Sequence, residues 1–189
     1  MREGRWQTTV GRDLRGRTLG LIGLGRLGGQ MAKYAHAFGM PVIAWSQNLT
    51  AEAASAAGAT RVEKAELFRQ ADIISIHTKL SPRTTGLVGA VELALMKPDS
   101  LLINTSRGPV IDESALLAAL HEGRIGGAGI DVYEPEPLPA NHPLRTAPRT
   151  LLTPHIGYVT EETYRAFYGG TVAAIEAWLA GKPIHVLPA

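Results

Sequence analysis

A glycine-rich turn near the start of the chain constrains the fold more than any other feature. A short apolar run ends at Ile22, and Gly23, Gly25 and Gly28 follow in the spacing GxGxxG before a stretch with helical periodicity. A second apolar run at 41–45 completes a strand–helix–strand unit, which is typical of dinucleotide binding. The first glycine would allow a tight turn, the second would let the backbone approach a pyrophosphate, and the third would let helix and strand pack closely.

The rest of the chain alternates apolar runs with helical patterns. This alternation predicts an α/β fold with a doubly wound parallel sheet, the Rossmann NAD(P)-binding fold. Asp112 is expected to cap a helix that stops at Gly123, and the Pro-rich stretch 134–148 is expected to be a loop. We expect strands at 18–22, 41–45, 71–77, 100–104, 125–132 and 150–152, and helices at 26–38, 50–57, 64–70, 113–122 and 161–180, with a short one before Met96.

Composition excludes several classes of function. The chain of 189 residues contains no cysteine, which rules out disulfides, thiolate metal sites and thiol nucleophiles, and we expect no metal site. The net charge of +2 is small and the basic residues are scattered, so we expect no nucleic-acid partner. We find no apolar run long enough to span a membrane and no signal-peptide core at the N-terminus, so we expect a cytoplasmic protein with no membrane partner.

Three polar residues in the second half of the chain are candidates for chemistry. Arg107 follows a predicted strand, where its guanidinium would hold a carboxylate through two parallel hydrogen bonds, although a surface arginine paired with a nearby acid is the alternative. His155 suits proton exchange near neutral pH, although a structural, partly buried histidine would look the same. Glu136 would raise the pKa of that imidazole if it lay beside it, although a solvated loop glutamate is equally compatible with the sequence.

Four segments carry a resemblance to a known family. They read LGLIGLGRLG at 19–28, LLINTSRG at 101–108, GIDVY followed by Glu136-Pro137 at 129–137, and LTPHIG at 152–157. In order and spacing, from about residue 11 to residue 157, they resemble the cofactor-binding domain of the NAD(P)-dependent D-2-hydroxyacid dehydrogenases. That family includes enzymes acting on D-3-phosphoglycerate, D-lactate, glyoxylate and hydroxypyruvate.

The resemblance implies an oxidoreductase that transfers a hydride between NAD(P)H and a small 2-keto acid or D-2-hydroxy acid. It implies that Arg107 orients the carboxylate and keto oxygen of the substrate, that His155 is the general acid/base, and that Glu136 pairs with the imidazole. Backbone groups of Arg26 and Leu27 would contact the pyrophosphate. The other implied cofactor contacts are Gly23, Gly25, Gly28, Ser46, Thr78, Thr105, Ser106, Asp131 and Gly157.

Two positions depart from the pattern of the family. Ser46, followed by Gln47 and Asn48, stands where NAD-specific relatives usually carry an acidic residue for the ribose hydroxyls. Without that carboxylate NADP becomes acceptable, but no arginine follows immediately to bind a 2′-phosphate, so the choice between NAD and NADP stays open with a lean toward NADP. Lys79 replaces the proline that usually follows a His-Thr pair, and a solvated loop lysine is one interpretation.

Members of the family have a substrate domain ahead of the fingerprint, whereas this sequence begins almost at the fingerprint. We therefore expect residues 1–189 to be the NAD(P)-binding domain, the N-terminal part of the substrate domain to be absent, and a helix and tail at about 160–189 to return toward it. A homodimer is expected from the resemblance, with Trp6 as a candidate contact, although a lone exposed tryptophan is equally compatible with the sequence. The alternatives are a non-catalytic NAD(P)-binding or redox-sensing interaction module, or an inactive truncated dehydrogenase.

Overall fold

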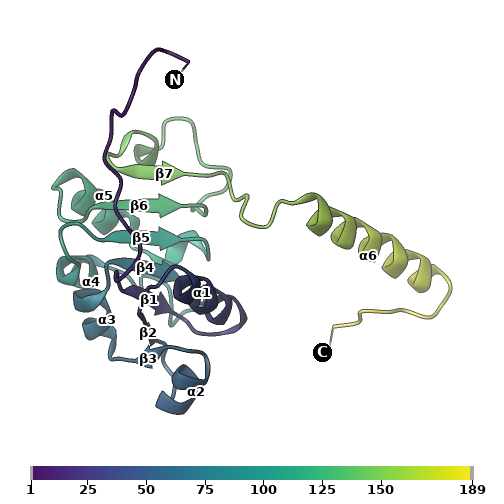
Figure 1. The fold of residues 1–189 in the computed structure, drawn as a ribbon. Helices are drawn as coiled ribbons and strands as arrows, with labels where there is room; N and C mark the ends of the chain where they lie inside the picture. The colour runs from purple at the N-terminus through teal and green to yellow at the C-terminus, as the bar shows by residue number, and fades with distance from the viewer. Residues whose placement is uncertain (1, 188–189) are drawn as a thin grey trace. The chain divides into compact units, whose positions relative to one another are not determined.

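The computed structural model of the protein describes residues 2–187 and divides into two compact units. Met1–Pro154 form the first unit and His155–Ala189 form the second. All strands found among the described residues belong to the first unit, and the second unit contains one long helix (Figure 1). The parallel sheet and its core are therefore features of the first unit.

The first unit is built on a parallel sheet. Within residues 2–187 the sheet has seven strands in the order β3-β2-β1-β4-β5-β6-β7, and every neighbouring pair is parallel (Figure 1). The order reverses between β1 and β4, which is where doubly wound sheets bind ligands, beyond the carboxyl ends of the strands. The strands are β1 (Leu19–Ile22), β2 (Val42–Trp45), β3 (Thr60–Arg61), β4 (Ile73–Ile76), β5 (Leu101–Asn104), β6 (Gly127–Ile130) and β7 (Thr150–Leu152).

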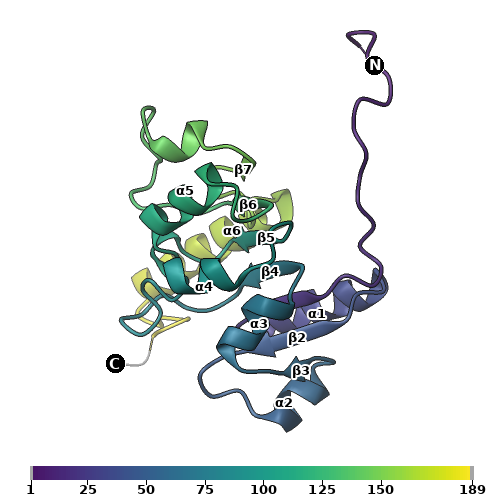
Figure 2. The same ribbon diagram turned by 90° about the vertical axis from the view of Figure 1, so that its left-hand side faces the viewer.

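Helices connect most of these strands and cover the sheet. Figure 2 shows α3, α4 and α5 in a row on the side turned toward the viewer. The helices of this unit are α1 (Arg26–Ala37), α2 (Ala51–Ala56), α3 (Lys64–Gln70), α4 (Ala90–Leu95) and α5 (Glu113–His121), with 3-10 turns η1 (Gly108–Val110) and η2 (Pro143–Thr146).

The core has two layers, one on each face of the sheet, because successive side chains of a strand point to opposite faces. One layer joins strand residues such as Ile74 and Leu102 to buried residues of α3, α4 and α5, including the fully buried Phe68. The other joins Leu21 of β1 to Ala32 of α1, with other small side chains around them. Small residues on α1 let that helix lie close to the strands, and this fixes the position of its N-terminus at the end of β1.

Side-chain caps mark where α2 and α5 begin. Asp112 accepts a hydrogen bond from the backbone of Ala115 at 3.1 Å, which confirms the predicted cap of α5. Thr50 caps α2 in the same way. Just past α5, Gly123 has a φ of +71°, a left-handed conformation that favours glycine and ends the helix as predicted.

Nearly every predicted element is present, with ends that differ by a few residues. The strand β3 was not predicted, because two exposed residues at a sheet edge show no periodicity. Within the Pro-rich stretch 134–148, which was expected to be a loop, the structure has the short 3-10 turn η2. The predicted α/β doubly wound parallel fold is confirmed.

The second unit consists mainly of α6 (Glu161–Leu179), which Thr160 caps by accepting a hydrogen bond from Thr163. No residue of α6 is buried. Among the described residues, no helix combines the length and apolar character needed to cross a membrane. The large apolar side chains of α6 that are more than half exposed are Phe167, Tyr168, Val172, Ile175, Trp178 and Leu179.

Candidate active site

The glycine loop after β1 has the geometry of a cradle for a diphosphate. Gly23 has a φ of +95°, and a Cβ there would lie 2.7 Å from the carbonyl oxygen of His77. A Cβ on Gly28 would lie only 2.1 Å from the carbonyl oxygen of Gly23. In contrast, a Cβ on Gly25 would meet no protein atom within 4 Å. The first and third glycines are therefore required by packing, and the second borders open space.

The N-terminus of α1 adds a favourable field for an anion. The first turn of the helix carries no acidic residue, and its N-cap, Gly25, has no side chain with which to cap the helix. The first backbone N–H groups of a helix have no acceptor within it, and the positive end of the helix dipole lies there. Arg26 and Leu27 are exposed at this end. The residues present thus fit the pyrophosphate of a dinucleotide.

A cavity of about 320 Å³, the Arg107 cavity, lies at the carboxyl ends of β4 and β5. Leu27 lines it from the first turn of α1, Thr78 from the end of β4, and Arg107 from the turn after β5. Thr105 and Ser106 also line it. The cavity therefore brings together Leu27, from the segment predicted to bind the cofactor, and Arg107, which was predicted to bind a carboxylate.

Buried Asn104 braces the turn that carries Arg107. The Asn104 side chain, which is 1% exposed, donates to the carbonyl oxygen of Arg107 at 2.9 Å and accepts from the backbone of Ser106 at 3.0 Å. The Ser106 hydroxyl donates to the carbonyl oxygen of Thr78, which ties the turn to the end of β4. The Arg107 side chain donates to the carbonyl oxygen of Ser106 at 2.6 Å. The side chains of Asn104 and Ser106 therefore hold the backbone of this turn in place.

A close backbone contact brings Glu136 to the same edge of the sheet as Arg107. A Cβ on Gly108 would lie 2.5 Å from the backbone of Tyr133, so only glycine allows this approach. The Glu136 carboxylate accepts a hydrogen bond from the backbone N–H of Tyr133 at 2.8 Å. Arg107 and Glu136 thus flank one backbone junction, formed by Gly108 and Tyr133, at the carboxyl ends of β5 and β6.

Asp131 follows β6 and is 5% exposed. Its carboxylate accepts a hydrogen bond from the hydroxyl of Thr153 at 2.5 Å. The hydroxyl of Tyr133 lies 2.8 Å from the carbonyl oxygens of Ile130 and Thr153. Burial, together with the negative charge of Asp131, raises the pKa of Tyr133. Hydrogen bonds therefore tie the loop after β7 to the end of β6 just before the second unit begins.

Sequence reasoning missed His77, which lines the Arg107 cavity. Burial lowers the pKa of its imidazole, so the ring is neutral at pH 7. Its Nε2 lies 2.9 Å from the hydroxyl of Ser75. The signal available in the sequence was its place directly after the apolar run 73–76, at the end of a central strand.

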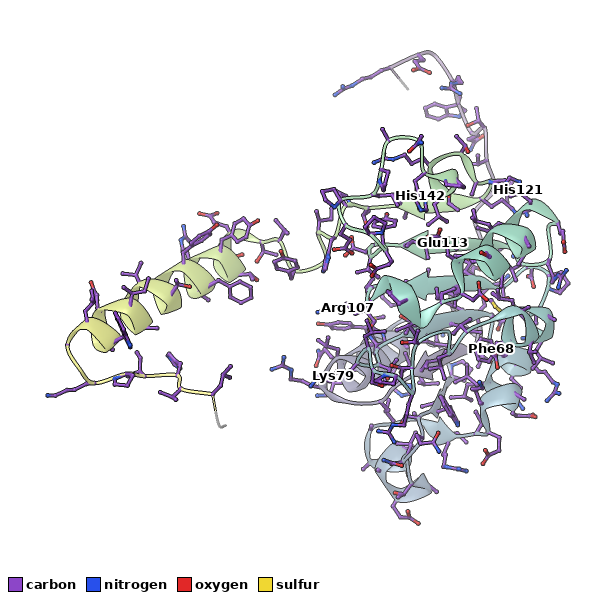
Figure 3. The ribbon with its side chains drawn as sticks, turned by 180° about the vertical axis from the view of Figure 1, so that it is seen from behind. Phe68, Lys79, Arg107, Glu113, His121 and His142 are labelled. Carbon is purple, nitrogen blue, oxygen red and sulfur yellow. The ribbon has the colours of Figure 1, made fainter. Side chains whose placement is uncertain are left out.

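A second cavity, of about 470 Å³, lies at the ends of β1, β2 and β4, and we call it the Trp45 cavity. Ser46, which was predicted to contact the ribose, lines it after β2 together with Gln47 and Asn48. Lys79 and Arg83, from the loop after β4, line it as well. Figure 3 shows Lys79 and Arg107 on the same side of the sheet unit, away from Phe68 in the core. Sequence reasoning missed Arg83, because it is distant in sequence from Ser46.

His155 and Gly157 belong to the second unit. His155 has a φ of +54°, a left-handed conformation that is uncommon for a residue with a side chain and that recurs at functional positions. Its ring meets the ring of Tyr158 edge-on, with centroids 5.6 Å apart, and Tyr158 stacks on Phe167 of α6. The pairing of Glu136 with the His155 imidazole stays a prediction, as do the roles of the other site residues.

Comparison with known proteins places this arrangement in a family. Residues 1–157 match the family model described as D-isomer specific 2-hydroxyacid dehydrogenase, NAD binding domain. A glyoxylate reductase of Thermococcus litoralis is 43% identical over 171 residues, which are 86% of this chain and 51% of that protein. The chain thus spans about half the length of this relative.

Solved structures agree with this assignment. A glyoxylate reductase from Paecilomyes thermophila matches with a TM-score of 0.82 and 37% identity, over 99% of this chain and 57% of that one. An acyclic imino acid reductase in complex with NADPH and D-Arg matches with a TM-score of 0.78 and 34% identity, over 95% of this chain and 56% of that one. The glycine cradle, the doubly wound sheet and these matches agree, and the chain belongs to the D-isomer specific 2-hydroxyacid dehydrogenases through their NAD-binding domain.

Proposed function

We propose that this chain is the cofactor-binding part of an NAD(P)-dependent D-2-hydroxyacid dehydrogenase that reduces small 2-keto acids. The observation that carries the proposal is the Arg107 cavity, because one wall belongs to the first turn of α1 and another to a braced arginine. A bound nicotinamide coenzyme would supply the hydride for the carbonyl carbon. A guanidinium beside that position is suited to an anionic 2-keto acid.

Each of three side chains would have a separate task. Arg107 would hold the substrate carboxylate with its fork of donors and stabilise charge on the keto oxygen. His155 would donate a proton to that oxygen as general acid. Glu136, already anchored to the Tyr133 backbone, would orient the imidazole and favour its protonated form. The close packing at Gly108 supports the proposal, since it brings Arg107 and Glu136 to one edge.

The cofactor would lie along the carboxyl ends of the strands. Gly23, Gly25, Gly28, Arg26 and Leu27 would hold the pyrophosphate through backbone groups. The ribose and nicotinamide contacts would be Ser46, Thr78, Thr105, Ser106, Asp131 and Gly157. All of these except Gly157 follow strands or the glycine loop in the first unit, which supports their assignment.

We also infer the wider setting of the protein from its family. Residues 1–189 would be the NAD(P)-binding domain, with the segment from about 160 returning toward a substrate domain. The protein would act as a homodimer in the cytoplasm. The side chain of Trp6, at 69% exposure, supports a partner at the N-terminal arm. Sedimentation equilibrium of the protein and of Trp6→Ala tests the dimer, and cell fractionation tests the location.

The proposed reaction is tested by oxidation of NADH and NADPH in the presence of glyoxylate or hydroxypyruvate. Arg107→Ala should lower kcat/KM by about 100-fold, since a lost bidentate contact to a carboxylate removes about 2–3 kcal/mol. Arg69→Ala, which removes an exposed arginine of α3, is the matched control and should behave like the wild type. Cofactor binding without turnover of any keto acid would instead favour a non-catalytic binding module.

A further inference from the structure

The Trp45 cavity has an unusual charge for a ribose-binding position. Its lining includes Lys79 and Arg83 and, among the described residues, no Asp or Glu. We propose that these two cations bind the 2′-phosphate of NADPH, so that the protein prefers NADPH to NADH. This inference rests on the proposed function, because it takes the cavity as the adenosine end of the dinucleotide site.

Neither cation is committed to an ion pair. Both residues are exposed, and within residues 2–187 their side chains form no ion pair or hydrogen bond. Other cations nearby are already paired: Lys64 with Glu92 at 2.7 Å, and Arg61 with a carboxylate on its own segment at 2.8 Å. Lys79 and Arg83 therefore add net positive charge to the cavity, which favours a dianionic group.

The loop that carries the two cations is held by its own hydrogen bonds. The Thr84 hydroxyl donates to the carbonyl oxygen of Lys79 at 2.7 Å and accepts from the backbone of Ser81 at 2.8 Å. The backbone of Thr84 in turn donates to the carbonyl oxygen of Ser81 at 2.9 Å. Lys79 and Arg83 thus lie on a turn that is held by hydrogen bonds. Because the backbone of this turn is already ordered, binding a ligand there costs little further backbone entropy.

The part of the lining that follows β2 offers hydrogen bonds and no repulsion. Ser46, Gln47 and Asn48 supply neutral hydroxyl and amide groups after β2. A carboxylate at this point would accept hydrogen bonds from ribose hydroxyls and would repel a phosphate. Neutral donors after β2 and two cations after β4 line the same cavity, and together they are complementary to a phosphate monoester.

The position of Lys79 also fits one extended dinucleotide. Thr78, Lys79 and Leu80 line both the Arg107 cavity and the Trp45 cavity, so the two cavities share a wall. Gly23 lines the Trp45 cavity and Leu27 lines the Arg107 cavity. The glycine loop therefore extends between the two, with space for the pyrophosphate between nicotinamide and adenosine.

The test is equilibrium binding of NADPH, NADH, 2′,5′-ADP and 5′-AMP to the full chain, measured by coenzyme fluorescence and by calorimetry. These readouts need no turnover. Wild-type protein should bind NADPH at least about 10-fold tighter than NADH, and 2′,5′-ADP tighter than 5′-AMP. Lys79→Ala/Arg83→Ala should weaken NADPH and 2′,5′-ADP by about 10-fold and leave NADH and 5′-AMP within about 2-fold.

Two further variants sharpen this test. Lys33→Ala/Arg69→Ala removes the same charge from exposed positions of α1 and α3 and should leave the preference unchanged. Ser46→Asp should reverse the preference toward NADH. Equal binding of NADPH and NADH by wild type, or an unchanged preference in the Lys79/Arg83 variant, would overturn this inference and leave the proposed function standing. Failure to bind either coenzyme would overturn both.

Discussion

Replacement of Gly25 by alanine should separate cofactor binding from folding. Gly25 has a φ of −78° and a ψ of −156°, an extended conformation with negative φ that does not require glycine, and a Cβ there meets no protein atom within 4 Å. The free energy of unfolding should therefore change by less than about 1 kcal/mol. The added methyl group would occupy the space in which a pyrophosphate approaches the helix N-terminus.

The expected loss of affinity follows from the hydrogen bonds at stake. A hydrogen bond to a charged group contributes about 1.5–3 kcal/mol, so displacing one from the backbone weakens NADPH binding by about 10- to 100-fold. Gly29→Ala is the matched control, since its Cβ is equally unobstructed and lies within α1. That control should keep its affinity and gain up to about 1 kcal/mol of stability from helix propensity.

Gly28→Ala completes the series, because its Cβ would lie 2.1 Å from the carbonyl oxygen of Gly23. It should lose about 1–3 kcal/mol of stability as well as affinity. Urea unfolding followed by circular dichroism gives the stability, and fluorescence titration with NADPH gives the affinity. Wild-type affinity in Gly25→Ala would refute the reasoning, since it would mean that no ligand approaches this face of the loop.

Three further results are expected. Asn104→Ala should raise the KM for the keto acid more than the Kd for NADPH, because it frees the turn that carries Arg107; steady-state kinetics with a parallel binding titration checks this, and an unchanged KM would contradict it. His155→Ala should lower kcat by about 10²–10⁴-fold with unchanged NADPH affinity, and full turnover would remove it from the reaction. Partial burial of Asp72 opposes its ionisation, but hydrogen bonds from Lys97 and the Thr18 backbone outweigh this and hold the pKa of Asp72 below its usual value. A lowered pKa stabilises the fold above about pH 4, and this stabilisation is lost as the pH falls through the folded-state pKa. Asp72→Asn should therefore lower the free energy of unfolding by about 1–2 kcal/mol near pH 7 and by less in acid. Equal losses at both pH values in urea titrations would argue against this role of Asp72.

The fold could be predicted from local patterns because the sheet is parallel and covered by helices. Buried strands such as Leu19–Ile22 appear as continuous apolar runs, and Asp112 marks a helix start through its side chain. The two-residue strand β3 was not predicted, because it forms only through its pairing with β2 at the edge of the sheet. The order of the strands in the sheet could not be predicted from sequence periodicity either. That order makes β1 and β4 neighbours at the candidate site.

The candidate site was only partly predictable, for a related reason. The glycine spacing predicted a tight turn after β1, and close backbone contacts at Gly23 and Gly28 require glycine there. The two cations of the Trp45 cavity come from a segment more than one helix away from Ser46, so only the fold places them together. The same holds for the contact of Gly108 with Tyr133, which brings Arg107 and Glu136 to one edge.

The most direct test of the central claim is the product formed from hydroxypyruvate and NADPH by the purified protein, analysed on a chiral column. We expect D-glycerate in amounts equal to the coenzyme oxidised, with the product lost in Arg107→Ala and retained in Arg69→Ala. Coenzyme that binds without being oxidised, or a product that forms equally in Arg107→Ala, would contradict the claim that the Arg107 cavity is the site of reduction.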